Sequence, residues 1–352
     1  MAVDLGSLIS GVKEAITFDE LSDKRIAIDA YNTIYQFLSI IRQPDGTPLT
    51  DSKNNVTSHL SGLFYRTINL LEHRITPIYV FDGIPSHLKR RTIEARIRRR
   101  QEAAEEWKKA QEKGMLEEAR MHAMASSRIT KEIVNSSKEL LSYMGIPYIQ
   151  APGEGEAEAA HLTRSGLVYA SGSQDYDLFL FGSDVVIRNL TISGKRKLPR
   201  RNVYVNIELN RIVLRNLLEN LGIDREQLIM LGMLVGTDFN EGIDKIGPKT
   251  ALKIVKERKT IVEVENYIKE KYGKTFEIDP REVMDVFENP EVVSYQEEEF
   301  QKVLTEPKPN KESILEFMCD KHEFAEERIN KFADKLIEMK EGPKQKGIEK
   351  WL

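Results

Sequence analysis

The chain has 352 residues, of which 40% are hydrophobic and 31% are charged, and its formal net charge is −4. This composition is typical of a globular protein with one large domain or two of ordinary size. No run approaches 18 apolar residues and Cys319 is the only cysteine, so we expect no membrane span, no internal disulfide and no thiolate zinc cluster. The N-terminus also lacks the pattern of a signal peptide, which favours an intracellular protein.

Two short apolar segments in the first quarter of the chain each end in an acid. Lys24–Asp29 (K-R-I-A-I-D) and Thr76–Asp82 (T-P-I-Y-V-F-D) are predicted to be buried strands. Ala30–Arg42 is expected to be a helix, and Ser58–Arg74 has apolar residues at helical spacing. Strands that alternate with helices predict a mostly parallel sheet with crossover helices.

Residues 83–135 are polar, highly charged and without strand character, so we expect a helical insertion there. Within it, Leu88–Arg100 carries seven basic residues and one acid. If this segment is a regular helix, Lys89, Arg96 and Arg100 fall within about 20° of one line along its surface. Such a stripe fits a row of phosphates. A solvated helix face is the alternative, but the basic run offers only one acid for pairing, so we favour phosphate contact.

Two pairs of acids follow the next two predicted strands, Pro147–Gln150 and Leu167–Ala170. The pairs lie in A-P-G-E-G-E-A-E and S-Q-D-Y-D-L, and are Glu154 with Glu156 and Asp175 with Asp177. One interpretation is a divalent-metal site. The other is that the first pair are acids of a helix's first turn, where the macrodipole favours them, and the second pair lie in a solvated turn.

The spacing of the first pair brings the two interpretations together. Residues two apart on a helix point ~200° apart, so we expect Glu154 in the turn before a helix and Glu156 in its first turn. Glu158 lies outside the pairs and is interpreted as a further helix-start acid.

Asp29 and Asp82 resemble the two acid pairs because they too stand at the ends of predicted strands. Ligands of parallel sheets bind beyond the carboxyl ends of the strands. Carboxylates gathered at that edge raise one another's pKa unless cations neutralise them. The sequence therefore predicts an α/β fold, with a mostly parallel central sheet covered by helices on both faces, and a divalent-metal site at its edge.

Two more strands are expected at Asp184–Asn189 and Asn202–Asn206, joined by the basic loop Thr191–Arg201. Five of the seven residues in Lys195–Arg201 are basic. An exposed hairpin loop is one interpretation of this loop, and the sequence does not rank the alternatives.

A helix–hairpin–helix is expected at about residues 225–260. Gly247 closes a turn, and Pro248 suits the first position of the helix that follows. Backbone N–H groups at that helix start, with Lys249 beside them, could bind a phosphate of a DNA duplex. An ordinary helical turn is the competing interpretation. Asp238 precedes the motif closely enough to reach the acidic edge.

The last residues differ in character from the rest. We expect a single domain over residues 1–335, followed by a tail, residues 336–352, that contains the breaker E-G-P-K and then Q-K-G-I-E-K-W-L. The spacing of its apolar residues suits one face of a helical turn that docks in a partner's groove. This predicted peptide, residues 345–352, presents Gln345, Ile348, Trp351 and Leu352.

Together these motifs resemble the flap endonuclease family of structure-specific 5′ nucleases. The resemblance covers nearly the whole chain and rests on I-D-A-Y-N-T-I-Y-Q-F, T-S-H-L-S-G-L-F-Y-R-T, Y-V-F-D-G-I-P, A-P-G-E-G-E-A-E-A, S-Q-D-Y-D-L-F-L-F-G, G-T-D-F-N and I-G-P-K-T-A. It implies 5′ flap endonuclease and 5′–3′ exonuclease activity on branched DNA, in Okazaki fragment maturation and DNA repair. It further implies two Mg²⁺ ions, for which Mn²⁺ is expected to substitute, and a 5′-phosphorylated product.

The resemblance also implies roles for single residues. Lys89 and Arg96 match the basic residues that hold the scissile phosphate beneath a helical gateway and cap. Tyr35 matches a tyrosine that stacks on a base, although a core aromatic is an equal alternative, and Arg42 and Thr57 match positions near a pocket for a one-nucleotide 3′ flap. The active-site carboxylates implied are Asp29, Asp82, Glu154, Glu156, Asp175, Asp177 and Asp238.

The tail resembles a peptide that binds a sliding clamp of the proliferating cell nuclear antigen type, and the chain alone is expected to be a monomer. Its resemblance to archaeal members favours a cytoplasmic location, whereas a eukaryotic source would favour the nucleus. Two departures from the family pattern stand out: Ala2 replaces a glycine after the first methionine, and Lys245 replaces a glycine in the hairpin.

Two other functions fit parts of the same pattern. A clamp-tethered DNA-binding scaffold that does not cut would keep seven acids near phosphate at an electrostatic cost. A related nuclease acting on bubbles, Holliday junctions or duplex ends would share the acids, but the short chain and the terminal peptide favour flaps.

Overall fold

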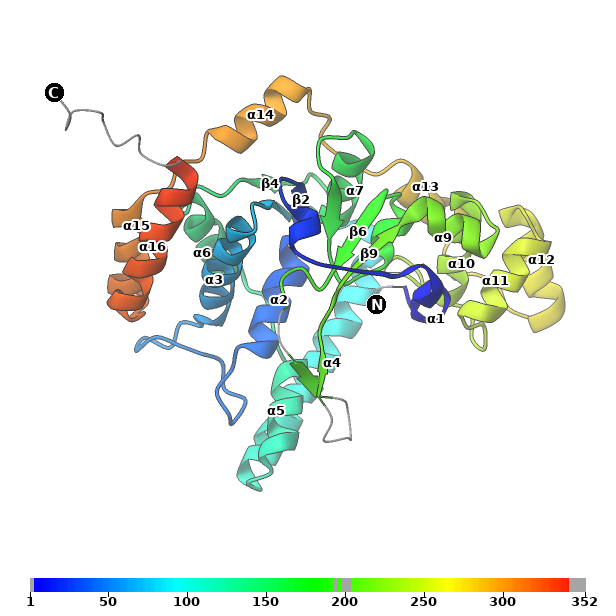
Figure 1. Ribbon diagram of the computed structural model, residues 1–352. Coiled ribbons are helices and arrows are strands. Elements are labelled where there is room, and N and C mark those ends of the chain that lie inside the picture. The colour runs from blue at the N-terminus through cyan, green and yellow to red at the C-terminus, as the bar shows by residue number, and fades with distance from the viewer. Residues whose placement is uncertain (1–2, 193–194, 198–203, 342–352) are drawn as a thin grey trace. The chain divides into compact units, whose positions relative to one another are not determined.

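The computed structural model describes residues 3–192, 195–197 and 204–341 (Figure 1). The chain divides into two compact units. Unit 1 comprises Met1–Thr33, Tyr79–Gln101 and Ile149–Tyr295, and unit 2 comprises Ile34–Ile78, Glu102–Tyr148 and Gln296–Leu352. No helix within the described residues is long and apolar enough to cross a membrane.

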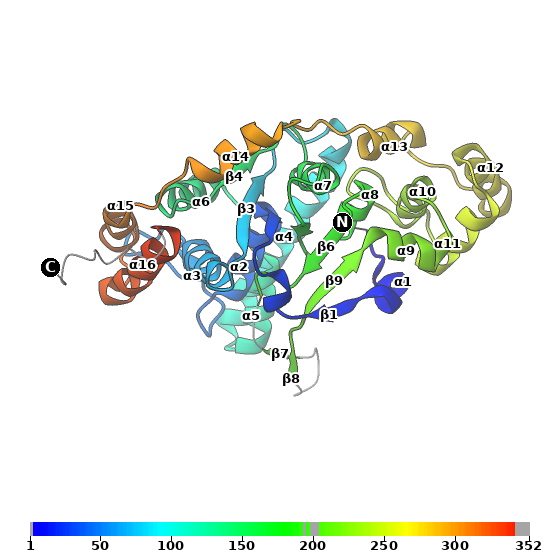
Figure 2. The same ribbon diagram turned by 45° about the horizontal axis from the view of Figure 1, so that its top comes forward.

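A seven-stranded sheet runs in the order β1-β9-β6-β5-β2-β3-β4 (Figures 1 and 2). Its central pairs β2–β5 and β5–β6 are parallel, whereas β9 is antiparallel to both β6 and β1. Helices lie on both sides of the sheet, so the expected α/β fold is confirmed, with an antiparallel edge that the sequence had not indicated. The strands are β1 Glu14–Ile16, β2 Arg25–Asp29, β3 Thr76–Phe81, β4 Tyr148–Gln150, β5 Ala170–Gly172, β6 Val185–Arg188 and β9 Leu209–Val213.

The central strands are buried on both faces. Ile26, Ala27 and Ile28 of β2 are at most 1% exposed, as are Val80 and Phe81 of β3. A strand covered on both sides has continuous apolar residues instead of an alternating pattern. This continuous apolar pattern is why K-R-I-A-I-D and T-P-I-Y-V-F-D could be recognised as strands from the sequence. Each segment ends in an acid.

The helices of unit 1 pack on this sheet and on one another. Helix α7 packs on β2, on β5 and on the short helix α8, and α10 packs on α8, α11 and α13. The acids that follow β4 and β5 are therefore carried on elements that pack on one another. The helices wholly within unit 1 are α1 Gly6–Ile9, α7 Gly155–Arg164, α8 Asp177–Leu180, α9 Leu214–Leu221, α10 Arg225–Val235, α11 Pro248–Glu257, α12 Ile261–Tyr272 and α13 Pro280–Glu288.

The predicted helix–hairpin–helix is formed by α10 and α11. Gly247 is the N-cap of α11 and Pro248 is its first residue, as expected. Lys245, where the family pattern has glycine, adopts a left-handed backbone with φ of +70°. An L-residue pays roughly 1–2 kcal/mol for this conformation. The hairpin geometry is thus formed with a lysine at a position that favours glycine.

Unit 2 is helical. Helix α3 packs on α6 and α16, and α15 packs on α6 and α16. The insertion at residues 83–135 contains all of α4 and α5 and the start of α6, and none of its residues is in a strand, as expected. The remaining helices are α2 Ala30–Ile40, α3 Ser58–Glu72, α4 Arg90–Glu112, α5 Leu116–Ala125, α6 Lys131–Tyr143, α14 Glu297–Thr305, α15 Lys311–Leu315, the π-helical turn Glu316–Lys321 and α16 Glu326–Glu341, of which α2 and α4 begin in unit 1.

Two strand predictions need correction. The run Leu167–Ala170 was predicted as a strand, but β5 begins only at Ala170. Leu167 instead closes the end of α7, because its N–H donates to the carbonyl of Leu162. The basic loop Thr191–Arg201 contains a strand, β7 Lys195–Lys197, which pairs with β8 Tyr204–Asn206 in a separate two-stranded sheet.

The predicted sliding-clamp-binding peptide at the C-terminus lies outside the residues that the structure describes. Helix α16 ends at Glu341, and the predicted clamp-binding residues 345–352 lie outside the described residues. Ala2 also lies outside them.

Candidate active site

All seven predicted acids lie in unit 1, and six stand at the ends of strands or the starts of helices. Each buried acid is perturbed by others from distant segments: Asp29 by Asp82 and Asp175, and Asp177 by Asp238. The structure therefore brings acids from five segments of the sequence together. Their positions are the end of β2 (Asp29), the residue after β3 (Asp82), the N-cap and first turn of α7 (Glu154 and Glu156), the residue two before α8 and its first residue (Asp175 and Asp177), and the turn after α10 (Asp238).

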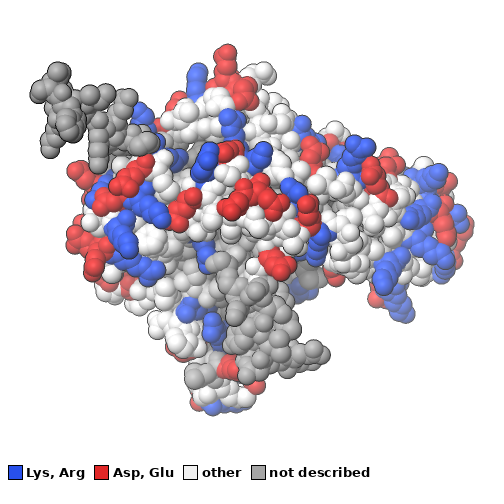
Figure 3. Space-filling view, in the orientation of Figure 1, with Lys and Arg blue, Asp and Glu red and all other residues white. Residues whose placement is uncertain are grey.

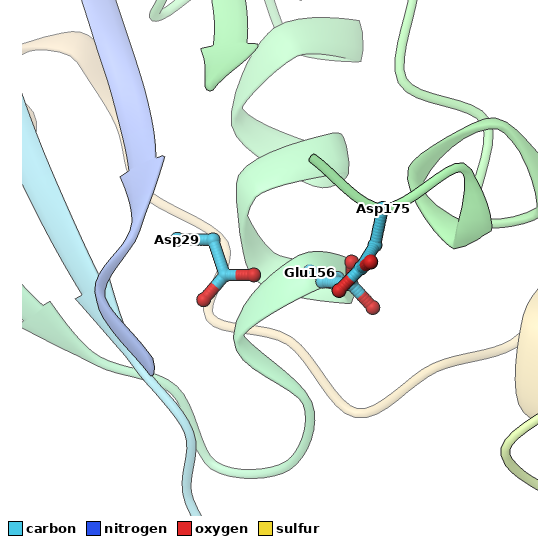
Figure 4. A group of neighbouring side chains, drawn as sticks. All are labelled: Asp29, Glu156 and Asp175. Carbon is cyan, nitrogen blue, oxygen red and sulfur yellow. The ribbon is translucent and has the colours of Figure 1, made fainter. Parts of the chain in front are cut away.

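Three of the acids form a close group, which we name the acid triad: Asp29, Glu156 and Asp175. Each contributes one carboxylate oxygen to a set in which all members lie within 4.8 Å of one another. Figure 4 shows Glu156 on α7 and Asp175 on the loop before α8 directed toward each other, with Asp29 directed toward both. One ion could contact all three oxygens at once.

The pKa values of this region are raised. Burial, and then the charges of Asp82 and Asp175, raise the pKa of Asp29 to about 8. Burial and the neighbouring carboxylates of Asp177 and Asp175 raise the pKa of Glu156 well above its usual value. Because negative charge at this edge is short of compensation, added positive charge would be bound favourably.

A second pair of acids, Glu154 and Asp238, is compensated by cations of the chain, and we name them the charge-paired acids. Lys89 Nζ forms an ion pair with Glu154 and lies 3.6 Å from Asp238. Arg96 Nη2 donates to both oxygens of Asp238, at 2.5 and 2.6 Å. Although burial opposes it, the charges of Lys89 and Arg96 hold the pKa of Asp238 below its usual value.

The two cations come from different local structures, which corrects the predicted basic stripe. Lys89 ends a 3₁₀ turn, His87–Lys89, and α4 begins only at Arg90. Lys89 is therefore not part of the regular helix that carries Arg96 and Arg100. The two cations converge nonetheless, since the Lys89 ammonium lies 5.0 Å from the ring centroid of Phe239, the residue after Asp238.

The residues of this region fit a divalent cation. Among the described residues, the Oε1 atoms of Glu154 and Glu156 are buried without a hydrogen-bond partner. A buried carboxylate oxygen without a donor is unfavourable and calls for a positive partner. Carboxylate oxygens are the ligands that Mg²⁺ and Mn²⁺ prefer.

The three residues of unit 2 that are predicted to contact DNA differ in their surroundings. Arg42 donates from all three guanidinium nitrogens, to the carbonyls of Leu38 and Gly46 and to Ser127 Oγ. Thr57 is 5% exposed at the N-cap of α3, and Tyr35 is partly exposed on α2. These contacts show that Arg42 holds the turn after α2, and the DNA roles of the three residues stay predictions.

The helix–hairpin–helix offers a more open surface. Lys249 is exposed in the first turn of α11. A Cβ atom built on Gly247, the N-cap, would meet no atom within 4 Å. The helix start is therefore accessible to a phosphate group.

Glu158 is buried, in contrast to the expectation of an ordinary helix-start acid. It does lie in the first turn of α7, but its side chain has no exposed surface and accepts a hydrogen bond from the N–H of Val293 at 2.9 Å. Burial raises its pKa to about 7. The carboxyl holds the segment after α13 against α7, a contact that the helical pattern alone does not reveal.

Three polar residues beside the acids were missed by the sequence reasoning. Thr92 donates through its hydroxyl to the carbonyl of Asp238 at 2.8 Å. Asn32 and Ser173 contact Asp29 and Asp175. The one available signal was their position, because Asn32 follows a strand-end acid by three residues and Ser173 precedes another acid by two.

A cavity of about 730 Å³ lies beside Arg96. It is lined by α4, including Thr92 and Arg99, and by the loop after α10, including Asn240 and Asp244. On the face drawn in Figure 3, by contrast, Lys and Arg side chains are interspersed with Asp and Glu. The basic residues Arg91, Arg96 and Arg99 of α4 thus line a cavity next to Asp238.

Comparison with known proteins places these residues in matched regions. A family model described as the XPG N-terminal domain matches residues 1–103, and one described as the XPG I-region matches residues 145–238. The two regions contain all seven acids together with Lys89 and Arg96.

Full-length similarity is found as well. The chain is 48% identical over 352 residues to flap endonuclease 1 of Thermococcus onnurineus, covering 100% of this chain and 99% of the relative. It is similar to the solved structure of flap endonuclease-1 from Methanococcus jannaschii, with a TM-score of 0.73 and 36% identity, covering 96% and 99% of the two chains. The catalytic core of Rad2 in complex with DNA substrate, at 24% identity and a TM-score of 0.67 over 96% of this chain and all of that one, shares the fold.

Proposed function

The chain belongs to the flap endonuclease family, and from this premise we propose how its residues divide the work of cutting DNA. The protein is a metal-dependent endodeoxyribonuclease with 5′ flap endonuclease and 5′–3′ exonuclease activity. It hydrolyses a phosphodiester near the junction of single- and double-stranded DNA, in Okazaki fragment maturation and DNA repair. The observation that carries the site assignment is the acid triad. Among the described residues, Oε1 of its member Glu156 is buried without a hydrogen-bond partner. Lys89 and Arg96 pair with the neighbouring acids Glu154 and Asp238.

The metal is proposed to be Mg²⁺, with two ions held by the seven acids and Mn²⁺ able to replace them. The buried, unpartnered carboxylate oxygens and the raised pKa values support this proposal. When bound, such ions make a water molecule nucleophilic and stabilise the leaving 3′ oxygen, which yields a 5′-phosphate. The ligand set consists of Asp29, Asp82, Glu154, Glu156, Asp175, Asp177 and Asp238.

Lys89 and Arg96 are proposed to contact the scissile phosphate. Both are already directed at the acid cluster, where Lys89 rests on the ring of Phe239 and pairs with Glu154. A phosphate bound next to the triad would lie within reach of these cations, which would stabilise negative charge in the transition state. Positive charge must be placed here because seven acids would otherwise repel the phosphate.

The remaining DNA contacts are proposed from position and charge. Gly247 and Lys249 would bind a phosphate of the duplex at the start of α11, where the backbone is open. Arg100 would extend the phosphate contacts of α4, and Tyr35, Arg42 and Thr57 are assigned to the branch point only by the family resemblance. The substrate is accordingly branched DNA with a 5′ flap.

Both units are proposed to serve one nuclease domain, residues 1–335, that works as a monomer in the cytoplasm of an archaeon. Residues 345–352 are proposed to bind a sliding clamp through Gln345, Ile348, Trp351 and Leu352. Deleting residues 345–352 should abolish clamp binding in a pull-down and leave clamp-free flap cleavage intact.

Cleavage of four substrates tests the proposal: a 5′-flapped duplex, a bubble, a blunt duplex and a four-way junction. With Mg²⁺, we expect the flap to be cut fastest and the product to carry a 5′-phosphate that a ligase can seal. Asp177→Ala should be inactive while remaining folded. An intact flap after incubation with Mg²⁺ or Mn²⁺, or normal cleavage by Asp177→Ala, would contradict the proposal.

A further inference from the structure

Two neutral residues connect two members of the acid triad in a closed ring of hydrogen bonds. Asn32 donates from its backbone N–H to Asp29 Oδ1 at 2.9 Å and from its side-chain amide to Asp175 Oδ2 at 2.8 Å. Ser173 Oγ donates to Asp29 Oδ2 at 3.2 Å and accepts the backbone N–H of Asp175 at 3.2 Å. The ring therefore runs from Asp29 through Asn32 to Asp175 and back through Ser173.

We propose that Asn32 and Ser173 are positioning residues that hold Asp29 and Asp175 at ligand spacing before a metal ion binds. This inference rests on the proposed function, because it assigns the triad to a divalent cation. Neither residue would itself contact the ion or the DNA; each acts through the carboxylates it holds.

The physical reason is repulsion inside a buried site. Two carboxylates within 4.8 Å of a third repel one another strongly where water is scarce, and side chains free to rotate would move apart. Hydrogen bonds from N–H and O–H groups to a carboxylate are stronger than those between neutral groups, so they oppose such a movement. The ring thus keeps two ligands in place at the moment when their repulsion is greatest.

Neutral donors suit this purpose better than cations would. Lys89 and Arg96 compensate the charge of Glu154 and Asp238, so an ion that binds those acids must compete with them. Asn32 and Ser173 orient Asp29 and Asp175 but leave their negative charge available. The third member, Glu156, has its Oε1 buried without a partner among the described residues, which leaves an oxygen for the ion itself.

The local structure explains why these two residues can do this. Asn32 lies in the first turn of α2, directly after β2, so its N–H is one of the helix-start donors without a helical partner. Asp29 accepts that donor, which fixes its side chain against the helix start. Ser173 lies between β5 and α8, where its hydroxyl spans the gap between the two neighbouring parallel strands β2 and β5.

Variants can separate positioning from stability. Asn32→Ala and Asn32→Leu remove the amide that holds Asp175 but keep the backbone N–H to Asp29, and leucine also keeps the side-chain volume. Ser173→Ala removes the hydroxyl, and Ser173→Thr restores it. Ser183→Ala is the matched control, because Ser183 is fully buried and hydrogen-bonded to Ser171 and Val185 but contacts no acid.

The measurement is binding of Mn²⁺ to the full-length protein without DNA, by electron paramagnetic resonance of free Mn²⁺, with circular dichroism to confirm folding. We expect about a 10- to 100-fold weaker Mn²⁺ affinity in Asn32→Ala, Asn32→Leu and Ser173→Ala, the range typical of residues that orient metal ligands. Ser173→Thr should recover most of the affinity. Ser183→Ala should lower the melting temperature and leave Mn²⁺ affinity unchanged.

Flap cleavage across a Mn²⁺ titration provides the second readout. Weakened positioning should raise the Mn²⁺ concentration for half-maximal cleavage while the Michaelis constant for DNA changes little. Unchanged Mn²⁺ affinity in folded Asn32→Leu and Ser173→Ala would overturn the inference, and equal weakening in Ser183→Ala would show a merely structural role.

The failure of this inference and that of the proposed function look different. If the unsubstituted protein binds Mn²⁺ and cuts the flap but the variants bind Mn²⁺ normally, only the inference fails. If the unsubstituted protein binds no Mn²⁺ and cuts no flap with either metal, the proposed function fails and the inference fails with it.

Discussion

Two groups among the seven acids, the charge-paired acids and the acid triad, differ in how the chain stabilises their negative charge. On one side, Glu154 and Asp238 are neutralised by Lys89 and Arg96 from the start of the basic segment. On the other, Asp29 and Asp175 of the acid triad accept hydrogen bonds from the neutral residues Asn32 and Ser173. The pKa values record the contrast, because that of Asp238 is lowered whereas those of Asp29 and Glu156 are raised.

The difference indicates that one group of acids serves substrate binding and the other serves metal binding. The charge-paired side carries cations that a phosphate could attract away from the acids, so it is suited to substrate. In the triad, Asp29 and Asp175 are oriented by neutral donors, and the pKa values of Asp29 and Glu156 are raised, so this side is suited to metal. A change on either side should therefore reveal which of the two tasks that side performs.

The largest effect should come from substituting one acid on each side. Asp175→Asn and Asp238→Asn should both lower flap cleavage by about a thousandfold or more, equivalent to ~4 kcal/mol of transition-state stabilisation. Their effects on the metal-free protein should have opposite signs. Asp175→Asn relieves repulsion and should raise the melting temperature. Asp238→Asn should lower it, because it removes the carboxylate that pairs with Arg96 and leaves Lys89 with Glu154 alone. The comparison breaks if both substitutions shift the melting temperature in the same direction in EDTA.

Removing a cation of the charge-paired side should separate chemistry from metal binding. Lys89→Met should lower cleavage at saturating metal by about 100- to 1000-fold, since it removes stabilisation of transition-state charge. Mn²⁺ affinity without DNA should not weaken, because the lysine competes with the ion for Glu154. Arg91→Met is a useful control, because Arg91 pairs with Glu277 and contacts none of the seven acids in the structure. Weaker Mn²⁺ binding in Lys89→Met would place the lysine in metal positioning instead.

Metal removal should expose the raised pKa values through the pH dependence of stability. The pKa of Asp29 is raised to about 8 and that of Asp177 to about 7, above an unfolded value of ~3.9. The folded protein therefore binds protons that the unfolded chain has lost, and the associated stability declines as pH rises through 7 and 8.

In EDTA, the melting temperature should accordingly be several degrees higher at pH 6 than at pH 9. With saturating Mg²⁺ this dependence should vanish or reverse, because the ion replaces the protons. Asp29→Asn should flatten the EDTA curve. If the melting temperature in EDTA is independent of pH between 6 and 9, repulsion among the buried acids around Asp29 does not destabilise the metal-free protein, and the prediction is wrong.

The smallest effect is expected at Thr92, which supports the charge-paired side from α4. Thr92→Val removes one neutral hydrogen bond to the carbonyl of Asp238, worth about 0.5–1.5 kcal/mol. Cleavage should fall by only about 2- to 10-fold, and Mn²⁺ affinity should be unchanged. A loss as large as that of Lys89→Met would mean that α4 is positioned chiefly by this bond.

Much of the fold and of the site was predictable from local patterns. The apolar runs before Asp29 and Asp82 predicted buried strands, and the structure shows that these strands are covered on both faces. The two-residue spacing predicted that Glu154 would precede α7 and that Glu156 would lie in its first turn, as the structure shows. Gly247 and Pro248 predicted the start of α11. In each case neighbouring residues determine backbone conformation, and a strand end determines where its acid must emerge.

Where local patterns misled, contacts between segments decided the outcome. The apolar run at Leu167 resembled a strand, but it closes α7. Strand β9 was missed because its place depends on pairing with β6 and β1. Glu158 was interpreted as a helix-start acid, which it is, but the sequence did not indicate that it is buried and hydrogen-bonded to the N–H of Val293.

The sequence by itself indicated that acids from four segments emerge at one edge of an α/β sheet, because apolar strand runs and the positions of their ends are local properties. Only the tertiary structure decided which acids are neutralised and which are merely oriented. Asn32 and Asp175 are 143 residues apart, and Arg96 and Asp238 are 142 apart. Donors at such separations meet their acceptors only after the sheet and α4 are in place, so no pattern along the chain could assign cations to one side of the cluster and neutral donors to the other.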